Sequence, residues 1–564
     1  MADHTEKPFE AELCEHLAAN GWLYSESGVG YDKERALFPE DVFAWLAQTQ
    51  PDELAKVLTP GAPDEAKQRS QLLDRIVKVL DTPLDAGGGT LNLLRRGFRQ
   101  VTARFEMCQF QPETGLNPAT LARYSAVRVR VMRQVYYSTA SKRSVDLVLL
   151  VNGLPVATCE LKTDFTQSVT EAIEQYKKTR QPKDPATKHV EPLFGFGSRA
   201  LVHFAVSNTE VWMTTRLAGE KTHFLPFNTG CDGGAGNPPN PGGSATSYLW
   251  ERVLQRDAWL TILGKFLHTE TTTRRDPISG AQTRTTTLLF PRFHQWEVVT
   301  SLAETARTEG PGHRYLVQHS AGSGKTNSIA WTAHRLARLH NADDQKVFDS
   351  VIVVTDRTVL DDQLQEAIRQ IDGGQGVVAT TGDDDVRHSG EGSKSGLLAK
   401  SLLDGRLIIV VTIQTFPYAM DAIRQTAGLA AKRFAVIADE AHSSQTGATA
   451  NRLKEVLSAE QLADVADGGE TDVEDELAAE MTARAASENV SYFAFTATPK
   501  AKTLELFGRR DADGTPQPFH VYTMKQAIEE EYILDVLPGY QTYKTAFQIA
   551  QSATDGKVKP AGGG

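Results

Sequence analysis

The sequence predicts an α/β protein in two parts, a mixed sheet ahead of residue 250 and a parallel sheet after residue 290. Three observations support this fold class. Apolar residues alternate with others over residues 145–162, which is typical of a strand hairpin. After residue 290, short apolar segments alternate with helical ones, as in a parallel sheet. Between the two parts, residues 228–243 are dense in Gly, Pro and Asn and indicate a long loop.

Composition places the chain among ordinary globular proteins. Its 564 residues are 40% hydrophobic and 23% charged, and this length suggests about three or four domains. The sequence has no apolar run of about 18 residues, and its first ten residues lack an apolar stretch, so we expect a cytoplasmic protein. Without any CxxC pair, the cysteines predict neither a zinc site nor a disulfide framework; they are Cys14, Cys108, Cys159 and Cys231.

The net charge gives weak and ambiguous information about partners. The chain has 60 Lys and Arg against 71 Asp and Glu, a net charge of −11. An acidic balance argues against nucleic acid as a partner, because phosphate neutralisation needs basic surface. A net charge does not describe local patches, so this objection stays open.

Three further polar segments predict connections or insertions. Residues 269–287 are rich in Thr and indicate an interdomain crossing or a hairpin. Residues 372–397 contain several Gly-rich breaks and suggest an exposed insertion, whereas residues 464–479 form an acidic segment that we expect to be a solvated loop leading into a helix.

The strongest motif begins at Tyr315 and reads YLVQHSAGSGKT. An apolar strand leads into a Gly-rich turn and then an amphipathic helix, the arrangement of a P-loop that cradles phosphates with backbone N–H groups. Lys325 would contact the β- and γ-phosphates, and the Thr326 hydroxyl would bind Mg²⁺. The turn itself is formed by Gly322, Ser323 and Gly324. His319 stands where the motif normally has its first glycine.

A second nucleotide-site motif follows the P-loop lysine by 114 residues. An apolar strand over 434–438 ends in the sequence DEAH, residues 439–442. Carboxylates at the C-terminal end of a strand lie where open α/β sheets bind ligands. Asp439 would hold hydrated Mg²⁺ and Glu440 would orient the attacking water, with His442 completing the motif.

Polar side chains also follow other apolar strands of this part. Short hydroxyl and amide groups at strand ends suit contacts to a nucleic-acid backbone. The residues concerned are Asp356 and Arg357, and Thr412 and Gln414. Thr496 and Thr498 likewise follow an apolar strand.

This series of motifs resembles the first RecA-like domain of superfamily 2 helicases and translocases, over residues 288–540. The resemblance implies ATP-dependent movement on nucleic acid, coupling of hydrolysis to motion through Thr496 and Thr498, and adenine recognition by Gln295. These motors hydrolyse ATP between two such domains. We find no second one after residue 540, so we expect the chain to be the N-terminal portion of a longer protein.

A second set of reactive residues lies in the hairpin ahead of the motor. Asp146 falls on the face opposite Val145, Leu147 and Leu149, whereas Glu160 and Lys162 share one face of the next strand. Two carboxylates and a lysine at strand level are what Mg²⁺-assisted phosphodiester cleavage requires. The sequence therefore predicts a nuclease site.

The register of the hairpin tests this prediction. A tight turn at Asn152-Gly153 would pair Asp146 with Cys159, whereas a three-residue loop would pair Asp146 with Glu160. Because Pro155 cannot donate a hydrogen bond and weakens the tight form, we predict an odd-numbered loop or a bulge, with both carboxylates on one face.

The complete order resembles the motor subunit of type I restriction enzymes, in which a PD-(D/E)xK nuclease precedes a DEAH motor. In that family a helix with the pattern QxxxY follows the ExK strand. Gln175 matches the glutamine, but Thr179 occupies the tyrosine position, which leaves the roles of Gln175 and Tyr176 open. The opening helix resembles the family's first helix, whose acidic residue approaches the metal, and Glu10 is the matching residue. Arg128 and Arg130 add positive charge nearby and are possible DNA contacts.

This resemblance predicts four regions and several partners. We expect a nuclease domain over 1–250, a linker over 251–287, a motor domain over 288–540 and the start of a further linker over 541–564. The implied cofactors are ATP and Mg²⁺, with S-adenosylmethionine required only by the modification subunit. The implied partners are double-stranded DNA and the modification and specificity subunits, in a bacterial or archaeal cytoplasm.

Two other interpretations of the sequence stay open. One is a standalone nuclease-helicase of another phage-defence or DNA-repair system, which would need no methyltransferase partner. The other is a nucleic-acid docking protein whose nuclease fold only binds.

Overall fold

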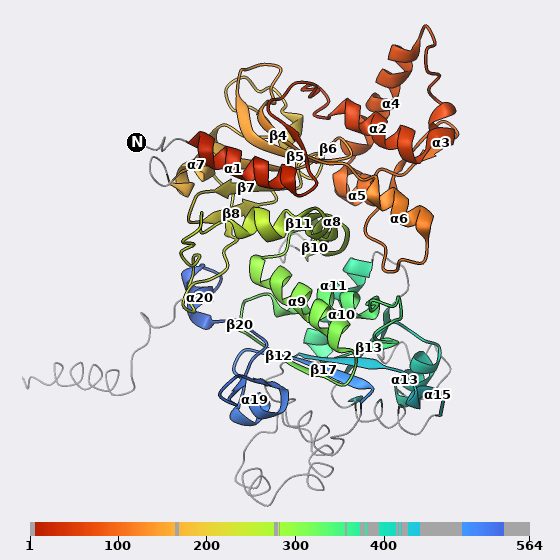
Figure 1. The fold of residues 1–564 in the computed structure, drawn as a ribbon, viewed down its shortest axis with the longest axis vertical. Helices are drawn as coiled ribbons and strands as arrows, with labels where there is room; N and C mark the ends of the chain where they lie inside the picture. The colour runs from red at the N-terminus through yellow and green to blue at the C-terminus, as the bar shows by residue number, and fades with distance from the viewer. Residues whose placement is uncertain are drawn as a thin grey trace, which may run out of the picture.

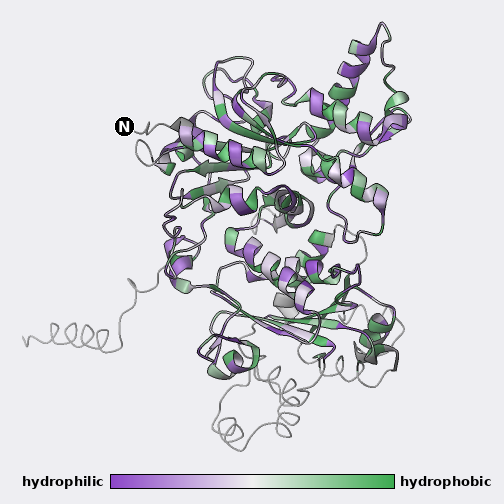
Figure 2. Cartoon of the chain, viewed as in Figure 1, coloured by the Kyte–Doolittle hydropathy of each residue, from purple (hydrophilic) through white to green (hydrophobic). Residues whose placement is uncertain are grey.

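A computed structural model of the chain describes residues 6–163, 168–275, 280, 282–355, 358–372, 378–380, 394–412, 415–416, 419, 423, 427–439 and 488–534. The predicted acidic segment 464–479 lies outside these residues, as does most of the predicted insertion 372–397. Hydrophobic residues follow the strands of both sheets, as Figure 2 shows, and the chain therefore buries its strands between helical layers.

The N-terminal part is built on a seven-stranded sheet in the order β1-β4-β5-β6-β7-β8-β9. β1 runs parallel to β4 and β6 parallel to β7, whereas the other neighbours are antiparallel. This confirms the predicted mixed sheet. The strands are β1 (Leu23–Ser25), β4 (Val129–Tyr136), β5 (Ser144–Val151), β6 (Leu154–Leu161), β7 (Val202–Val206), β8 (Val211–Thr214) and β9 (Leu225–Pro226).

Helices cover both faces of this sheet. α1 (Glu6–Ala19) packs against β1, β4 and β6, and α7 (Val169–Lys178) packs against β6, β7 and β8. The remaining elements of this part are α2 (Pro39–Thr49), α3 (Pro51–Ala55), α4 (Glu65–Leu80), α5 (Gly89–Arg96), the hairpin of β2 (Phe98–Gln100) and β3 (Ala103–Phe105), and α6 (Pro118–Ser125), with single 3₁₀ turns at Leu84–Ala86 and Pro192–Phe194.

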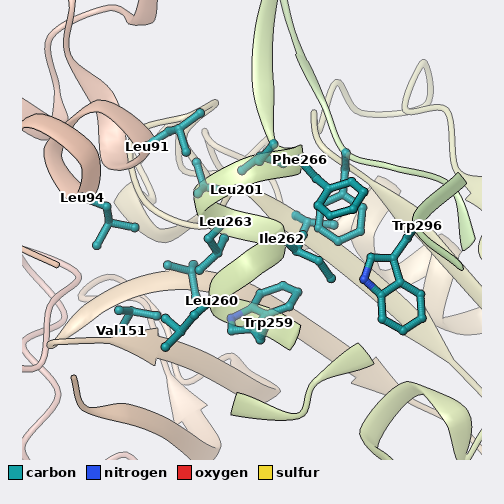
Figure 3. Packing of buried hydrophobic residues seen from close by; sticks show 14 of the residues in the cluster. Leu91, Leu94, Val151, Leu201, Trp259, Leu260, Ile262, Leu263, Phe266 and Trp296 are labelled. Atoms are coloured by element: carbon teal, nitrogen blue, oxygen red, sulfur yellow. The ribbon is translucent and has the colours of Figure 1, made fainter. Parts of the chain in front are cut away.

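The segment between the two sheets is helical and deeply buried. Two π-helical turns, Leu249–Val253 and Ile262–Phe266, flank α8 (Arg256–Thr261). In Figure 3, Trp259, Leu260 and Leu263 lie among side chains from β5 and α5. The predicted linker 251–287 therefore contributes fully buried residues to a shared core, which an extended linker would not do.

This segment ends in a hairpin of β10 (His268–Arg275) and β11 (Gln282–Leu289), paired antiparallel along its length. It confirms the hairpin alternative for residues 269–287. In Figure 1 the hairpin and α8 lie between the upper, N-terminal sheet and the lower, C-terminal one.

The C-terminal part contains a seven-stranded, all-parallel sheet in the order β14-β15-β13-β16-β17-β12-β20. This confirms the predicted parallel sheet. Its strands are β12 (Arg314–His319), β13 (Ser350–Thr355), β14 (Val378–Thr380), β15 (Ile408–Thr412), β16 (Phe434–Asp439), β17 (Val490–Thr496) and β20 (His520–Tyr522). The other elements are α9 (Phe293–Glu309), α10 (Lys325–Ala337), α11 (Thr358–Asp372), α13 (Lys394–Leu403), α15 (Ala427–Ala430), α19 (Ala501–Phe507), the hairpin of β18 (Arg509–Arg510) and β19 (Pro516–Gln517), and α20 (Met524–Glu529).

The two parts share one hydrophobic core. A single cluster of buried residues extends from Phe9 in α1 to Phe495 in β17. The Gly-rich loop 228–243 adds a polar connection, because Thr523 Oγ1 donates to the Gly233 carbonyl at 2.5 Å and the Ala235 N–H donates to Glu529 at 2.8 Å. All four cysteines have free thiols. Among the described helices, none combines the length and apolar character that crossing a bilayer requires.

Candidate functional site

The β5–β6 hairpin combines a tight turn with a bulge. Asn152 and Gly153 have φ values of 49° and 81°, as a two-residue turn requires, and Val151 pairs with Leu154 across it. Leu150 pairs with Pro155, but Leu149 pairs with Ala157, so Val156 is the extra residue of a β-bulge. The predicted bulge is thus confirmed, whereas the three-residue loop that we considered is not formed.

The bulge brings the two predicted carboxylates to one face of the sheet. Beyond it, Leu147 pairs with Cys159, and the same register places Asp146 opposite Glu160. The Leu161 N–H donates to Asp146 Oδ2 at 2.8 Å, which holds this carboxylate against β6. Thr158, two residues before Glu160, bonds to Tyr176 of α7 at 2.8 Å, so the shared face is the one that α7 covers.

Glu160 is the most strongly perturbed carboxyl of this site. Its side chain is 1% exposed and accepts a hydrogen bond from Arg180 Nε at 2.6 Å. Burial raises the pKa of Glu160 to about 8, the negative charge of Asp146 adds to this rise, and the Arg180 guanidinium opposes it. A buried carboxyl whose ionisation is made costly by a neighbouring carboxylate is part of a site that a cation would stabilise.

Lys162 lies directly beyond the end of β6 and is 3% exposed. Its backbone N–H donates to the Val206 carbonyl at 2.9 Å, and Nζ donates to the Leu161 carbonyl at 3.0 Å. These bonds hold the ammonium group beside the strand that carries Glu160.

Glu10 of α1 reaches the same site through one glutamine. Gln134 Nε2 donates to Glu10 Oε1 and to Asp146 Oδ1, both at 3.1 Å, and Arg133 pairs with Glu10 at 2.9 Å. Burial raises the pKa of Glu10, although the hydrogen bonds from Gln134 and Arg133 oppose this. The residue expected from the family resemblance therefore lies one side chain away from Asp146.

The end of α7 shows how the missing family tyrosine is accommodated. Thr179 Oγ1 donates to the Gln175 carbonyl at 2.9 Å, and its own carbonyl accepts from the Tyr137 hydroxyl at 3.1 Å. Tyr176 is fully buried against the sheet. Within the described part of the chain, Gln175 Oε1 is buried without a hydrogen-bond partner. This oxygen could therefore accept a further hydrogen bond between α7 and the sheet.

Arg128 and Arg130 take part in an internal ion-pair network. Asp41, which is completely buried, accepts from Arg130 Nε at 2.6 Å and from Arg128 Nε at 2.7 Å. Arg130 also donates to Ser25 and lies over the Phe38 ring. These contacts give both arginines a structural role inside the fold, and their contact with DNA stays a prediction.

The Gly-rich turn connects β12 to α10, as a P-loop requires. Gly322 and Gly324 have φ values of 75° and 77°, in the left-handed region that glycine adopts without strain. A Cβ on Gly324 would lie 2.5 Å from Nε2 of Gln295. Gln295 is buried in α9 and donates to the Gly324 carbonyl at 3.1 Å, so the predicted adenine-reading residue lies against the turn.

Lys325 and Thr326 begin α10, where the helix dipole favours an anion. Asp439 is the last residue of β16, and β17 lies between β16 and β12. Gln318 pairs with Thr496 across β12 and β17, and Asp439 pairs with Phe495 across β16 and β17. The P-loop, Thr496 and Asp439 are therefore at one edge of the sheet, which is the edge where open α/β sheets bind ligands.

Several predicted motor residues lie outside the described part of the chain, namely Asp356, Arg357, Gln414, Glu440 and His442. Thr412 ends β15 and bonds to Thr415 at 3.1 Å, and Thr498 is exposed beyond β17.

His319, which replaces the first glycine of the motif, belongs to a buried aromatic group. Its Nε2 lies 2.9 Å from Nδ1 of His520, and its ring contacts His294. His294 stacks on Tyr522 with ring centroids 3.8 Å apart. Burial lowers the pKa of His319 and lowers that of His294 to about 3, so both rings are neutral and pack as part of the core.

Comparison with known families agrees with this arrangement. Residues 10–222 match the family described as the type I restriction enzyme R protein N terminus (HSDR_N), and residues 294–561 match the SWI2/SNF2 ATPase family. The N-terminal part of the chain is therefore HsdR-like, and its C-terminal part is SWI2/SNF2-like. No curated protein matches it.

One similar solved structure is a fragment described as an HsdR subunit of a type I restriction enzyme from Vibrio vulnificus YJ016. The identity is 14%, the TM-score is 0.24, and the alignment covers 69% of this chain. It covers 52% of that structure, so the chain spans about half the length of the protein that it matches.

The HsdR-like chain has site residues that sequence patterns did not identify. Arg180, which binds Glu160, follows α7 with no motif to mark it. Gln134 has a φ of 48° and is identified by its hydrogen bonds to Glu10 and Asp146. Arg292 lies 3.4 Å from the centroid of the Tyr532 ring beside the P-loop. Each depends on a contact between segments distant in sequence.

The donor set at Asp146 and Glu160 fits Mg²⁺. This ion prefers oxygen ligands, retains several waters and is commonly held by only one or two carboxylates. No group of three or more His, Cys, Asp or Glu side chains suited to a metal occurs among the residues that the structure describes. At the P-loop, Thr326 and Asp439 offer the hydroxyl and carboxylate oxygens for a second Mg²⁺.

Proposed function

We propose that this HsdR-like chain is the restriction subunit, or part of it, of a type I restriction-modification system. In this proposal ATP-driven translocation of double-stranded DNA is coupled to Mg²⁺-dependent endonucleolytic cleavage away from the recognition site. The observation that carries the proposal is that one chain has two sites. One site consists of Asp146, Glu160 and Lys162 at the β5–β6 strand pair, and the other is the P-loop on the C-terminal sheet.

At the first site, Asp146 and Glu160 would hold Mg²⁺, which when bound activates water and polarises the scissile phosphate. Lys162 would offset the charge that develops on the phosphate. Gln134 and the Leu161 N–H hold Asp146 in place, and Arg180 holds Glu160. Gln175 and Glu10 complete the proposed set, as positioning residues at the edge of the site.

At the second site, Lys325 and the start of α10 would bind the phosphates of ATP, with Thr326 and Asp439 on its Mg²⁺. Gln295 would read the adenine, Glu440 would orient the attacking water, and Thr496 and Thr498 would couple hydrolysis to motion. Sequence recognition and methylation would belong to the specificity and modification subunits.

The motor is tested by Lys325→Ala in the complex assembled with its partner subunits. Because the lysine ammonium would contact the transferred phosphate, we expect ATP hydrolysis and distant cleavage to fall together, by about 10²-fold or more. A matched control is Lys346→Ala, at a lysine that follows α10 and lies outside the P-loop. Distant cleavage that persists in Lys325→Ala without ATP hydrolysis would contradict a motor that acts before the nuclease.

The partners are tested by purifying the tagged chain from its source cell. We expect methyltransferase and specificity chains to be recovered with it, and recovery of an active nuclease that lacks both would support a standalone system instead.

A further inference from the structure

A cationic cavity lies between the two parts of the chain, away from both sites above. Its volume is about 230 Å³. Its walls come from the end of α5, the turn that precedes β10 and the end of α10. The charged and titratable lining residues are Arg95, Arg96, Glu113, Lys265, His268, His334, Arg335 and Arg338.

The charges of the lining are unbalanced. Five Lys and Arg side chains face this cavity, against the single carboxylate of Glu113. Glu113 is already engaged, because its Oε1 accepts from Lys265 Nζ at 2.8 Å. Arg95 is held by the carbonyls of Leu263 and Leu267 at 2.8 and 2.5 Å, which fixes its guanidinium at the wall.

One of these cations has a buried donor without a partner. Within the described residues, Nε of Arg335 is buried and makes no hydrogen bond. Leaving such a donor unpaired is costly, and a bound acceptor removes that cost. Arg96, in contrast, is exposed.

Two cations of the lining have lowered pKa values. Burial lowers the pKa of Lys265 to about 8, and the positive charge of Arg335 lowers it further, although Glu113 opposes both. Burial also lowers the pKa of Arg335. An anion in the cavity would stabilise the charged forms of both side chains.

We propose that this cavity binds linked phosphate groups, either those of a small di- or triphosphate anion or successive phosphates of a DNA backbone. Guanidinium groups bind phosphate oxygens in paired, charge-assisted hydrogen bonds. A single carboxylate ligand would neutralise only one of the excess charges, whereas linked phosphate groups bring several charges and several acceptor oxygens into one cavity.

The cavity lies where the N-terminal part meets α10 of the C-terminal part, so a bound anion would contact both parts. α10 begins at Lys325 of the P-loop and brings Arg335 to the cavity near its other end, whereas Arg95 and Arg96 belong to the N-terminal part. A bound polyphosphate would remove the repulsion between these helix ends and join the two parts of the chain. Binding should therefore raise the melting temperature.

The test is titration calorimetry with tripolyphosphate on the full chain carrying Lys325→Ala, which weakens phosphate binding at the P-loop. We expect saturable binding of one anion and a higher melting temperature. Adding Arg335→Gln or Arg96→Gln should weaken binding about tenfold each, as expected for one charge-assisted hydrogen bond. Arg96 is exposed, so its variant tests the site even if Arg335→Gln unfolds the protein.

The matched control is Arg104→Gln, which removes an exposed charge outside the cavity and should leave binding unchanged. A short DNA duplex titrated in parallel distinguishes the two sources of phosphate. Binding of the duplex alone that weakens in the two cavity variants assigns the site to a DNA backbone, and tripolyphosphate binding alone assigns it to a small anion. If neither ligand binds, or if Arg104→Gln weakens binding as much as the cavity variants do, the proposal is wrong.

Discussion

At the scale of single residues, the chain separates charges that serve the proposed chemistry from charges that hold the fold. Glu160 and Asp41 are both buried carboxylates bound by arginine. Glu160 also faces a second carboxylate, and its pKa is raised. Asp41 faces two arginines that satisfy it, at 2.6 and 2.7 Å. The first arrangement suits a cation site, whereas the second is a structural ion pair.

Asp41→Ala should destabilise the protein by about 3–5 kcal/mol, because it leaves Arg130 buried without its counter-charge. The free energy of unfolding from urea denaturation measures this loss. The control, Glu304→Ala, removes an exposed partner of Arg307 and should cost no more than about 1 kcal/mol. Equal losses in the two variants would contradict the structural role of Asp41.

His203 should make stability depend on pH. It is buried with Nδ1 2.8 Å from Thr158, and burial lowers its pKa to about 3. The unfolded chain therefore binds a proton that the folded chain does not, between the ordinary histidine pKa of about 6.5 and that lowered value. Within this window the free energy of unfolding should fall as pH falls, by up to about 1.4 kcal/mol per pH unit.

His203→Gln should reduce this slope by up to about 1.4 kcal/mol per pH unit, measured by urea denaturation at a series of pH values. The contributions of His294 and His319, whose pKa values burial also lowers, should stay. The exposed His223 offers the comparison, because His223→Gln should leave the slope as it is. A slope that is the same in the wild-type protein and in His203→Gln would show that His203 is not the group responsible.

At the scale of elements, the β5–β6 hairpin determines whether a site exists. Alternation alone placed Glu160 and Lys162 together, but the face of Asp146 depended on one residue of register. The sequence contains both signals, Asn152-Gly153 for a tight turn and Pro155 against regular pairing. The chain combines them, with the bulge at Val156 restoring the pairing that the tight turn would have lost. Sequence reasoning could predict the bulge as one option but could not place it.

Gly153→Ala should destabilise this hairpin by well over about 1 kcal/mol. The residue has a φ of 81°, and an added Cβ would lie 2.4 Å from the Phe38 carbonyl oxygen. Gly219→Ala has a similar φ of 64° with open space around it, so it should show only the conformational cost of about 1 kcal/mol. Urea denaturation of both variants separates the two effects, and equal losses would mean that the contact with Phe38 is unimportant.

At the scale of the whole molecule, the fold class could be predicted from periodicity and the P-loop from its glycines, because both are local signals. The contact between the two parts of the chain could not be predicted from such local signals. Residues 251–287 are polar enough at their end to suggest a linker, yet Trp259 and Leu260 are completely buried in the shared core. Arg180 and Gln134 show the same limit at the site, since their importance comes from contacts with Glu160 of β6 and Glu10 of α1 that no local pattern encodes.

The net charge of −11 was a poor guide to the local charge of the surface, because it does not show which side chains the fold brings together. Five cationic side chains gather around one cavity although the chain as a whole is acidic. Only the fold brings Arg95, Lys265 and Arg335 together.

The central claim is that one chain carries a nuclease site separate from its motor. The most direct measurement compares DNA cleavage and ATP hydrolysis by the same assembled complex, with Mg²⁺, for Lys162→Ala and for the surface control Lys178→Ala. We expect Lys162→Ala to lose about 10²- to 10³-fold in cleavage while hydrolysing ATP at the wild-type rate, with both activities unchanged in Lys178→Ala. Loss of both activities in the Lys162→Ala complex, or DNA cleavage by that complex at the wild-type rate, would contradict a nuclease site that is separate from the motor.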